Sequence, residues 1–140
     1  MQYPGKVLGI DYGSKRIGIA ASDPTRMIAQ AVNTIENNER TFDKLVHIIA
    51  QEDITLIVVG MPYGQDGGKS SKAIEVEAFI GKLKLLTSIT IDTWDESYSS
   101  VKAHQAFLDT GMKKKKRRQK HRVDVMAARL MLQEYLDNHR

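Results

Sequence analysis

The sequence predicts an α/β fold in which one mixed five-stranded sheet is flanked by helices. Three apolar segments follow one another before residue 36 with no helix-length stretch between them, which predicts an antiparallel meander. Two further short apolar segments then alternate with stretches of helical spacing, which predicts parallel strands joined by helical crossovers. With 140 residues, 41% of them hydrophobic, the chain can bury a core, and we expect residues 1–140 to form one domain.

The N-terminal half is predicted to hold the meander and the first helix. Residues 6–12 are continuously apolar and end in an acid and a glycine, as in a central strand buried on both faces. Residues 16–21 form a second strand after a tight turn, and residues 27–35 complete the meander. Thr41 offers a helix cap, and apolar residues from there to Gln51 fall at helical spacing.

The C-terminal half is predicted to alternate strands and helices before ending in two helices. Its strands are short apolar runs, and its helices show an amphipathic period. In order, we expect a strand over 54–59, a helix over 73–86, a strand over 89–94, a helix from Ser97 or Ser99 to Gly111, and a helix over 123–136.

Several classes of protein are excluded by composition. No run of about 18 apolar residues exists, so no membrane span is expected. The first 13 residues lack the layout of a secretory signal. The absence of cysteine excludes disulfides and thiolate metal sites. We therefore expect a cytoplasmic protein.

One cationic segment dominates the charge pattern. Residues 113–122 carry eight Lys or Arg and no acid, whereas the rest of the chain has 13 basic and 17 acidic residues. Such a block is typical of a solvated loop that binds a polyanion, most commonly nucleic acid, with an affinity that falls as salt rises. A nonspecific solubility loop is the alternative. The nucleic-acid-binding candidates here are Lys113, Lys114, Lys115, Lys116, Arg117, Arg118, Lys120 and Arg122.

Two candidate site acids lie at the ends of predicted strands. Asp11 ends the central strand, where a charge is costly unless it is paired or binds metal, and where ligand sites of α/β sheets gather. Its alternative role is to cap the following turn. Glu96 ends the fifth strand, although the dipole of the next helix would also favour an acid there. Asp92 and Asp95 compete with Glu96 for the same role.

A third candidate, Asp124, begins the last predicted helix. Its neighbours four, seven and eleven residues on are Ala128, Met131 and Tyr135, so Asp124 heads the apolar, core-facing stripe. A first-turn acid that complements the helix dipole would explain its position but not its inward direction. We therefore favour a functional role.

Three converging carboxylates suit a hard cation with oxygen ligands, and we expect Mg²⁺ or Mn²⁺. Two such ions can stabilise both the attacking and the leaving oxygen of a phosphoryl displacement. His121 lies three residues before Asp124 and could be a further ligand or a base, or simply part of the basic segment.

The same residues carry a resemblance to a known family. The segments VLGIDYGSKRIGIAASD (7–23), VVGMPYGQDG (58–67), DES (95–97) and RVDVMAARLMLQEYL (122–136) resemble the YqgF/RuvX family of Holliday junction resolvases and pre-16S ribosomal RNA nucleases. The resemblance implies an RNase H-like fold, related to RuvC resolvases, and metal-dependent phosphodiester hydrolysis in the bacterial cytoplasm. It implies Asp11, Glu96 and Asp124 as catalytic metal ligands, raises the case for His121, and implies phosphate contacts from Lys15 and Arg16.

One departure from the family pattern bears on the substrate. Ser97 stands where the family usually has an arginine after the strand-end glutamate, so the role of that arginine is in question here. The leading hypothesis is a nuclease that matures the 5′ end of pre-16S rRNA, acting as a monomer or weak homodimer on structured RNA or a ribosomal particle. The alternatives are a DNA junction resolvase and a non-catalytic RNA- or ribosome-binding factor, because RNA and DNA offer the same phosphates.

Overall fold

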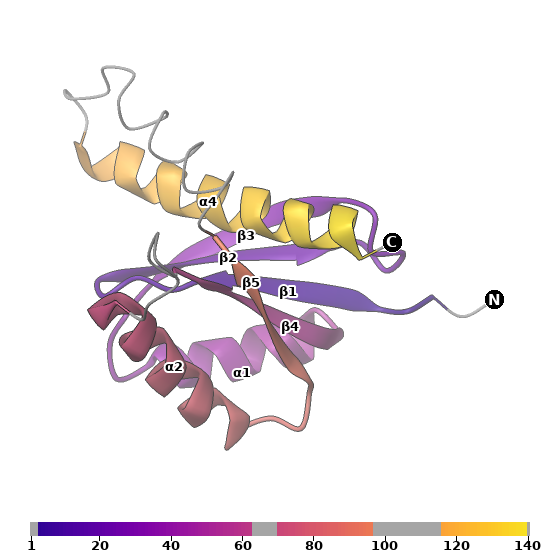
Figure 1. Cartoon of the computed structure of the whole chain (residues 1–140), viewed down its shortest axis with the longest axis horizontal. Coiled ribbons are helices and arrows are strands. Elements are labelled where there is room, and N and C mark those ends of the chain that lie inside the picture. The colour runs from indigo at the N-terminus through magenta and orange to yellow at the C-terminus, as the bar shows by residue number, and fades with distance from the viewer. Residues whose placement is uncertain (1–2, 63–69, 97–115, 140) are drawn as a thin grey trace.

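The computed structural model describes residues 3–62, 70–96 and 116–139, with the backbone alone for 116–125. Five strands and three helices are present in these residues (Figure 1). They are β1 (Lys6–Asp11), β2 (Arg16–Ser22), β3 (Ala29–Glu36), α1 (Thr41–Gln51), β4 (Ile54–Met61), α2 (Ser71–Lys84), β5 (Ile91–Asp95) and α4 (Lys116–Asn138).

The strands form one mixed sheet in the order β3-β2-β1-β4-β5. The β1–β2 and β2–β3 pairs are antiparallel, whereas β1–β4 and β4–β5 are parallel. The predicted meander and crossovers are therefore confirmed. β1 lies at the centre of the sheet, which explains why its sequence is apolar on both faces.

Helices cover both faces of the sheet. Helices α1 and α2 pack on one face and α4 crosses the other (Figure 1). Alternate strand residues divide between the two cores: Leu8 and Ile10 pack with α1 and α2, whereas Val7 packs with α4. The backbone of β1 lies close to α4, because a Cβ added at Gly9 would lie 2.9 Å from the Cβ of Leu132.

Two details of the first two helices differ from expectation. Thr41 is the first residue of α1 and not its cap, and its hydroxyl accepts a hydrogen bond from the Asn38 N–H at 2.9 Å. Helix α2 is capped by Ser70 and ends at Lys84. The expected helix to residue 86 was therefore two residues too long, and Leu86 is half exposed beyond the helix.

The predicted cationic loop is wrong from Lys116 onward. Helix α4 begins at Lys116, seven residues before the expected start, so residues 116–122 are helical. Lys, Arg and Gln all have high helix propensity, and extending an existing helix avoids a new nucleation step. Residues 113–115 and the helix expected up to Gly111 lie outside the described residues. Within the described ranges, no helix is long and apolar enough to cross a membrane.

Candidate active site

Asp11 ends the central strand on the face covered by α4. Val7 belongs to the core beneath α4, and Gly9 packs against Leu132 of that helix. Because strand side chains alternate, Asp11 projects from the same face as these two residues. The parallel pairing of β1, β4 and β5 brings the C-terminal ends of all three strands to one edge of the sheet.

Glu96 reaches this edge from β5. Its N–H donates to the Met61 carbonyl at 3.1 Å, which continues the β4–β5 ladder by one residue. Trp94, two residues earlier, packs in the core under α4, so Glu96 faces the same side. Between β5 and β1, Gly60 of β4 leaves the space that Glu96 occupies: a Cβ at Gly60 would collide with Oε1 of Glu96.

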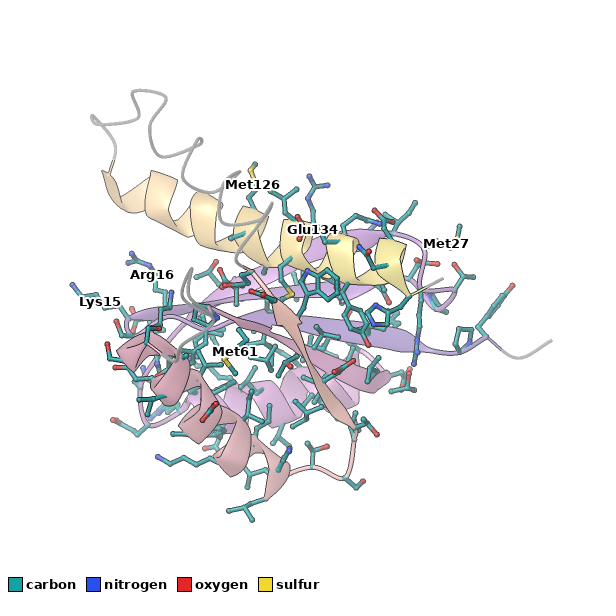
Figure 2. The ribbon with its side chains drawn as sticks, viewed as in Figure 1. Lys15, Arg16, Met27, Met61, Met126 and Glu134 are labelled. Atoms are coloured by element: carbon teal, nitrogen blue, oxygen red, sulfur yellow. The ribbon has the colours of Figure 1, made fainter. Side chains whose placement is uncertain are left out.

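The carboxyl groups of Asp11 and Glu96 are hydrogen-bonded to each other. Glu96 is 8% exposed, and its burial raises the pKa well above the usual 4.5, with the charge and hydrogen bond of Asp11 adding to the rise. The charge of Lys72 lowers this pKa, and the charge of Glu134 on α4 (Figure 2) raises it. A hydrogen bond between two carboxyl groups needs a proton on one of them. The pair therefore retains a proton that two separated acids would lose.

These two carboxyl groups fit a divalent cation. Their oxygens are the ligands that Mg²⁺ and Mn²⁺ prefer, and a cation can replace the shared proton in compensating two close negative charges. Among the residues that the structure describes, no group of three His, Asp or Glu side chains could hold a metal ion. Two carboxylates are enough for Mg²⁺, which keeps several waters and binds substrate phosphates as its remaining ligands.

Asp124 and His121 both lie on the backbone of α4. Asp124 precedes the buried residues Ala128 and Met131 by four and seven positions, a spacing that returns to one helix face. Because α4 starts at Lys116, His121 shares a continuous helix with Asp124, as its proposed role requires. The side chains of both residues lie outside the described set, so their convergence with Asp11 stays a prediction.

Lys15 lies in the turn between β1 and β2, and Arg16 is the first residue of β2, at the same edge of the sheet (Figure 2). Asn37, which the sequence analysis missed, fixes this turn: its N–H donates to the Lys15 carbonyl and its Nδ2 to the Gly13 carbonyl, both at 2.9 Å. No local sequence signal identifies Asn37, because the contact joins the end of β3 to a turn more than 20 residues away. Gly60 and Lys72 were also missed.

Of the two competitors of Glu96, Asp92 has a structural role. Its Oδ2 accepts a hydrogen bond of 2.6 Å from the Tyr135 hydroxyl, which ties α4 to β5. Burial, followed by this hydrogen bond and the charge of Asp92, raises the pKa of Tyr135 to about 12. Asp95 is exposed and, by strand alternation, lies on the opposite face from Glu96. Glu96 is therefore the strand-end acid that meets Asp11.

The raised pKa of Glu96 has a measurable consequence for stability. Below about pH 4.5 the Glu96 side chain is protonated in both the folded and the unfolded protein. As the pH rises, the unfolded protein loses this proton first, because its pKa is lower. The free energy of unfolding therefore falls. We expect wild-type protein in chelator to lose stability as the pH rises above about 4.5, and Glu96→Gln protein to lose less. Chemical denaturation of the two proteins at a series of pH values measures this difference in the free energy of unfolding. An equal loss in both proteins would contradict the buried, proton-sharing pair.

Comparison with known proteins assigns the family. The sequence matches the RuvX family, described as "Holliday junction resolvase", over residues 5–138. The chain belongs to the RuvX family. It is similar to a Parabacteroides distasonis protein named "Putative pre-16S rRNA nuclease", with 42% identity over 96% of each chain. A Roseiflexus protein of the same name is 36% identical, over 98% of this chain and 97% of its own.

Solved structures agree with this assignment at the level of the fold. RuvC of T. thermophilus, solved in complex with a Holliday junction substrate, matches with a TM-score of 0.59 over 96% of this chain and 94% of its own, at 14% identity. The fowlpox virus resolvase, in complex with Holliday junction DNA, matches with a TM-score of 0.54 over 96% of this chain and 98% of its own, at 12% identity. The predicted RNase H-like fold is thus confirmed. Membership of RuvX confirms the predicted enzyme class, a nuclease that hydrolyses phosphodiester bonds.

Proposed function

We propose that this RuvX protein is a divalent-metal-dependent nuclease that matures the 5′ end of pre-16S ribosomal RNA in the cytoplasm. The observation that carries the proposal is the pair of carboxyl groups, Asp11 and Glu96, at the C-terminal edge of three parallel strands. The names of relatives at 35–42% identity over nearly the whole chain support the RNA substrate.

In this proposal, one set of residues binds the cation and another set binds the substrate. Asp11, Glu96 and Asp124 hold Mg²⁺ or Mn²⁺, with His121 as a further candidate ligand. When bound, the cation polarises the scissile phosphate and lowers the pKa of an attacking water. Because Glu96 is buried, little bulk water reaches its carboxyl group, and electrostatic interactions there are stronger than in water.

Substrate phosphates are proposed to bind the cations around this edge. Lys15 lies in the turn directly after β1, which Asn37 fixes, and Arg16 begins β2 after this turn. Lys72, in the first turn of α2, is close enough to affect the pKa of Glu96 and can neutralise a phosphate there. The basic segment supplies contacts that do not depend on sequence, through Lys113, Lys114, Lys115, Lys116, Arg117, Arg118, Lys120 and Arg122.

Resolution of DNA junctions is the second candidate function. It is favoured by the description of the RuvX family as "Holliday junction resolvase" and by the fold shared with RuvC and the fowlpox resolvase. A resolvase cuts two strands symmetrically and is expected to act as a dimer, because the two cuts are related by twofold symmetry. A nuclease acting on one RNA end can act as a monomer or a weak homodimer.

Incubation with the two substrates tests the proposal. Purified protein is mixed with a precursor 16S RNA fragment or with a four-way DNA junction, each with Mn²⁺ or with chelator. We expect Mn²⁺-dependent cleavage of the RNA near the mature 5′ end and little cleavage of the junction. Symmetric cleavage of the junction alone would favour the resolvase. Binding of RNA that persists in chelator, without cleavage under any metal, would leave only a non-catalytic binding factor.

A further inference from the structure

A cavity of about 510 Å³ opens next to the proposed active site, on the other face of the sheet. Tyr12 lines it from the residue directly after Asp11, and the remaining walls come from the start of α1, the segment before it, and α2. Tyr12 packs with the core under α1 and α2, whereas Asp11 faces α4. The cavity and the carboxyl pair therefore lie at the same edge of the sheet, on its opposite faces.

Aromatic rings form the base of this cavity. Phe79 of α2 is 5% exposed, and its ring centroid lies 4.9 Å from that of Tyr12 and 5.5 Å from that of Phe42. The rings of Phe42 and Phe79 are stacked, at 25°. Tyr12 and Phe42 are only partly buried, so they offer ring surface to a ligand. A flat, apolar ligand fits such a surface.

The charges at the rim select the kind of flat ligand. Glu39 and Glu75 line the cavity with only Lys82 as a basic residue, so the rim carries more negative than positive charge. A phosphate would be repelled there, whereas a neutral heteroaromatic ring would not. The side chain of Asn38 and the two carboxylates add hydrogen-bonding groups of the kind that bind base edges.

We propose that this cavity is a base pocket that receives one unpaired nucleobase of the substrate strand, while the phosphates stay at the basic turn and the carboxyl pair. The proposal rests on the nuclease function proposed above. Asp11 and Tyr12 are consecutive residues at the edge of the sheet and face opposite sides of it, so a strand whose phosphate lies at Asp11 reaches Tyr12 by bending round this edge. Single-stranded RNA is commonly bound by stacking splayed bases on aromatic side chains.

An abasic scan tests the base pocket without requiring cleavage. Single-stranded RNA oligonucleotides, each lacking the base at one position, are titrated against protein in chelator. We expect one position, within two nucleotides of the cleavage site, to weaken binding about tenfold or more when its base is missing. In Phe42→Leu protein this penalty should disappear, whereas the control Val46→Ala, an exposed site on the same helix outside the cavity, should retain it.

A second variant tests the same cavity independently, so that the test does not depend on Phe42→Leu protein folding correctly. Ala78→Phe fills the cavity from an exposed position on α2 without removing a core side chain, and it should abolish the same penalty. A penalty that survives in both variants, or binding that is insensitive to every abasic site, would overturn the base pocket. If the RNA is cleaved but no single missing base weakens its binding, the base pocket is rejected and the nuclease proposal stands. If one missing base weakens binding but no metal ion supports cleavage, the nuclease proposal is rejected and the base pocket stands.

Discussion

Asp11→Asn protein is expected to lose RNA cleavage by on the order of 10³-fold while remaining folded. The carboxyl group of Asp11 is paired with that of Glu96, so its replacement removes one of the carboxylates that would hold a cation. Charge stabilisation by a bound metal contributes several kcal/mol to phosphodiester chemistry, and each 1.4 kcal/mol changes the rate tenfold. Initial rates on labelled precursor RNA with Mn²⁺ measure the loss, and circular dichroism checks the fold.

Asp95→Asn is the matched control for this variant. Asp95 is an exposed acid directly before Glu96 and projects from the opposite face of β5. The same change in charge is made next to the site without touching the carboxyl pair, so cleavage should stay within a few-fold of wild type. Unchanged cleavage in Asp11→Asn protein, or an equal loss in both variants, would remove the basis for assigning the site.

Gly60→Ala is expected to reduce cleavage by about 100-fold or more through a purely steric effect. The added Cβ would collide with Oε1, Cδ and Cγ of Glu96, so the carboxylate must leave its position over β4. No charge, hydrogen-bonding group or metal ligand is removed. Overpacking of this kind usually costs about 1–3 kcal/mol of stability, which most folded domains tolerate. Denaturation curves and cleavage rates on the same preparation separate the two effects.

Gly81→Ala is the matched control, because it adds the same methyl group at a position where that group contacts no other residue. No atom lies within 4 Å of a Cβ at Gly81, which sits inside α2. Alanine is favoured over glycine in a helix by roughly 0.5–1 kcal/mol, so this control should be slightly more stable and fully active. If Gly60→Ala protein were as active as the Gly81→Ala control, the position of Glu96 would not matter to catalysis.

Most of the fold could be predicted because its patterns are local. The continuous apolar run of β1 and the β-branched run of β4 indicate buried strands wherever they occur. The meander and crossovers were predicted, but the sequence does not show that β4 joins the sheet beside β1 and not beside β3. Strand and helix ends were harder to place. The charge of residues 113–122 suggested a loop, whereas helix propensity extends α4 back to Lys116.

The site was predictable only in part, for a physical reason. Asp11 and Glu96 follow predicted strands, so parallel pairing alone brings them to one edge. The contributions of Gly60 and Asn37 depend on what lies opposite them in space: one leaves room for Glu96, and the other holds a turn. Nothing in the neighbouring sequence marks either residue. The place of the Asp124 side chain stays a prediction from its helical spacing.

Calorimetric titration with Mn²⁺ tests the central claim most directly. This claim is that the Asp11–Glu96 pair holds a proton where a cation can bind instead. Each titration is made in two buffers of different ionisation enthalpy, so that proton release appears as a difference in heat. We predict that wild-type protein binds Mn²⁺ with release of a proton and that Asp11→Asn protein binds it far more weakly. Equal Mn²⁺ affinity in the two proteins, with no release of a proton in either, would contradict the account.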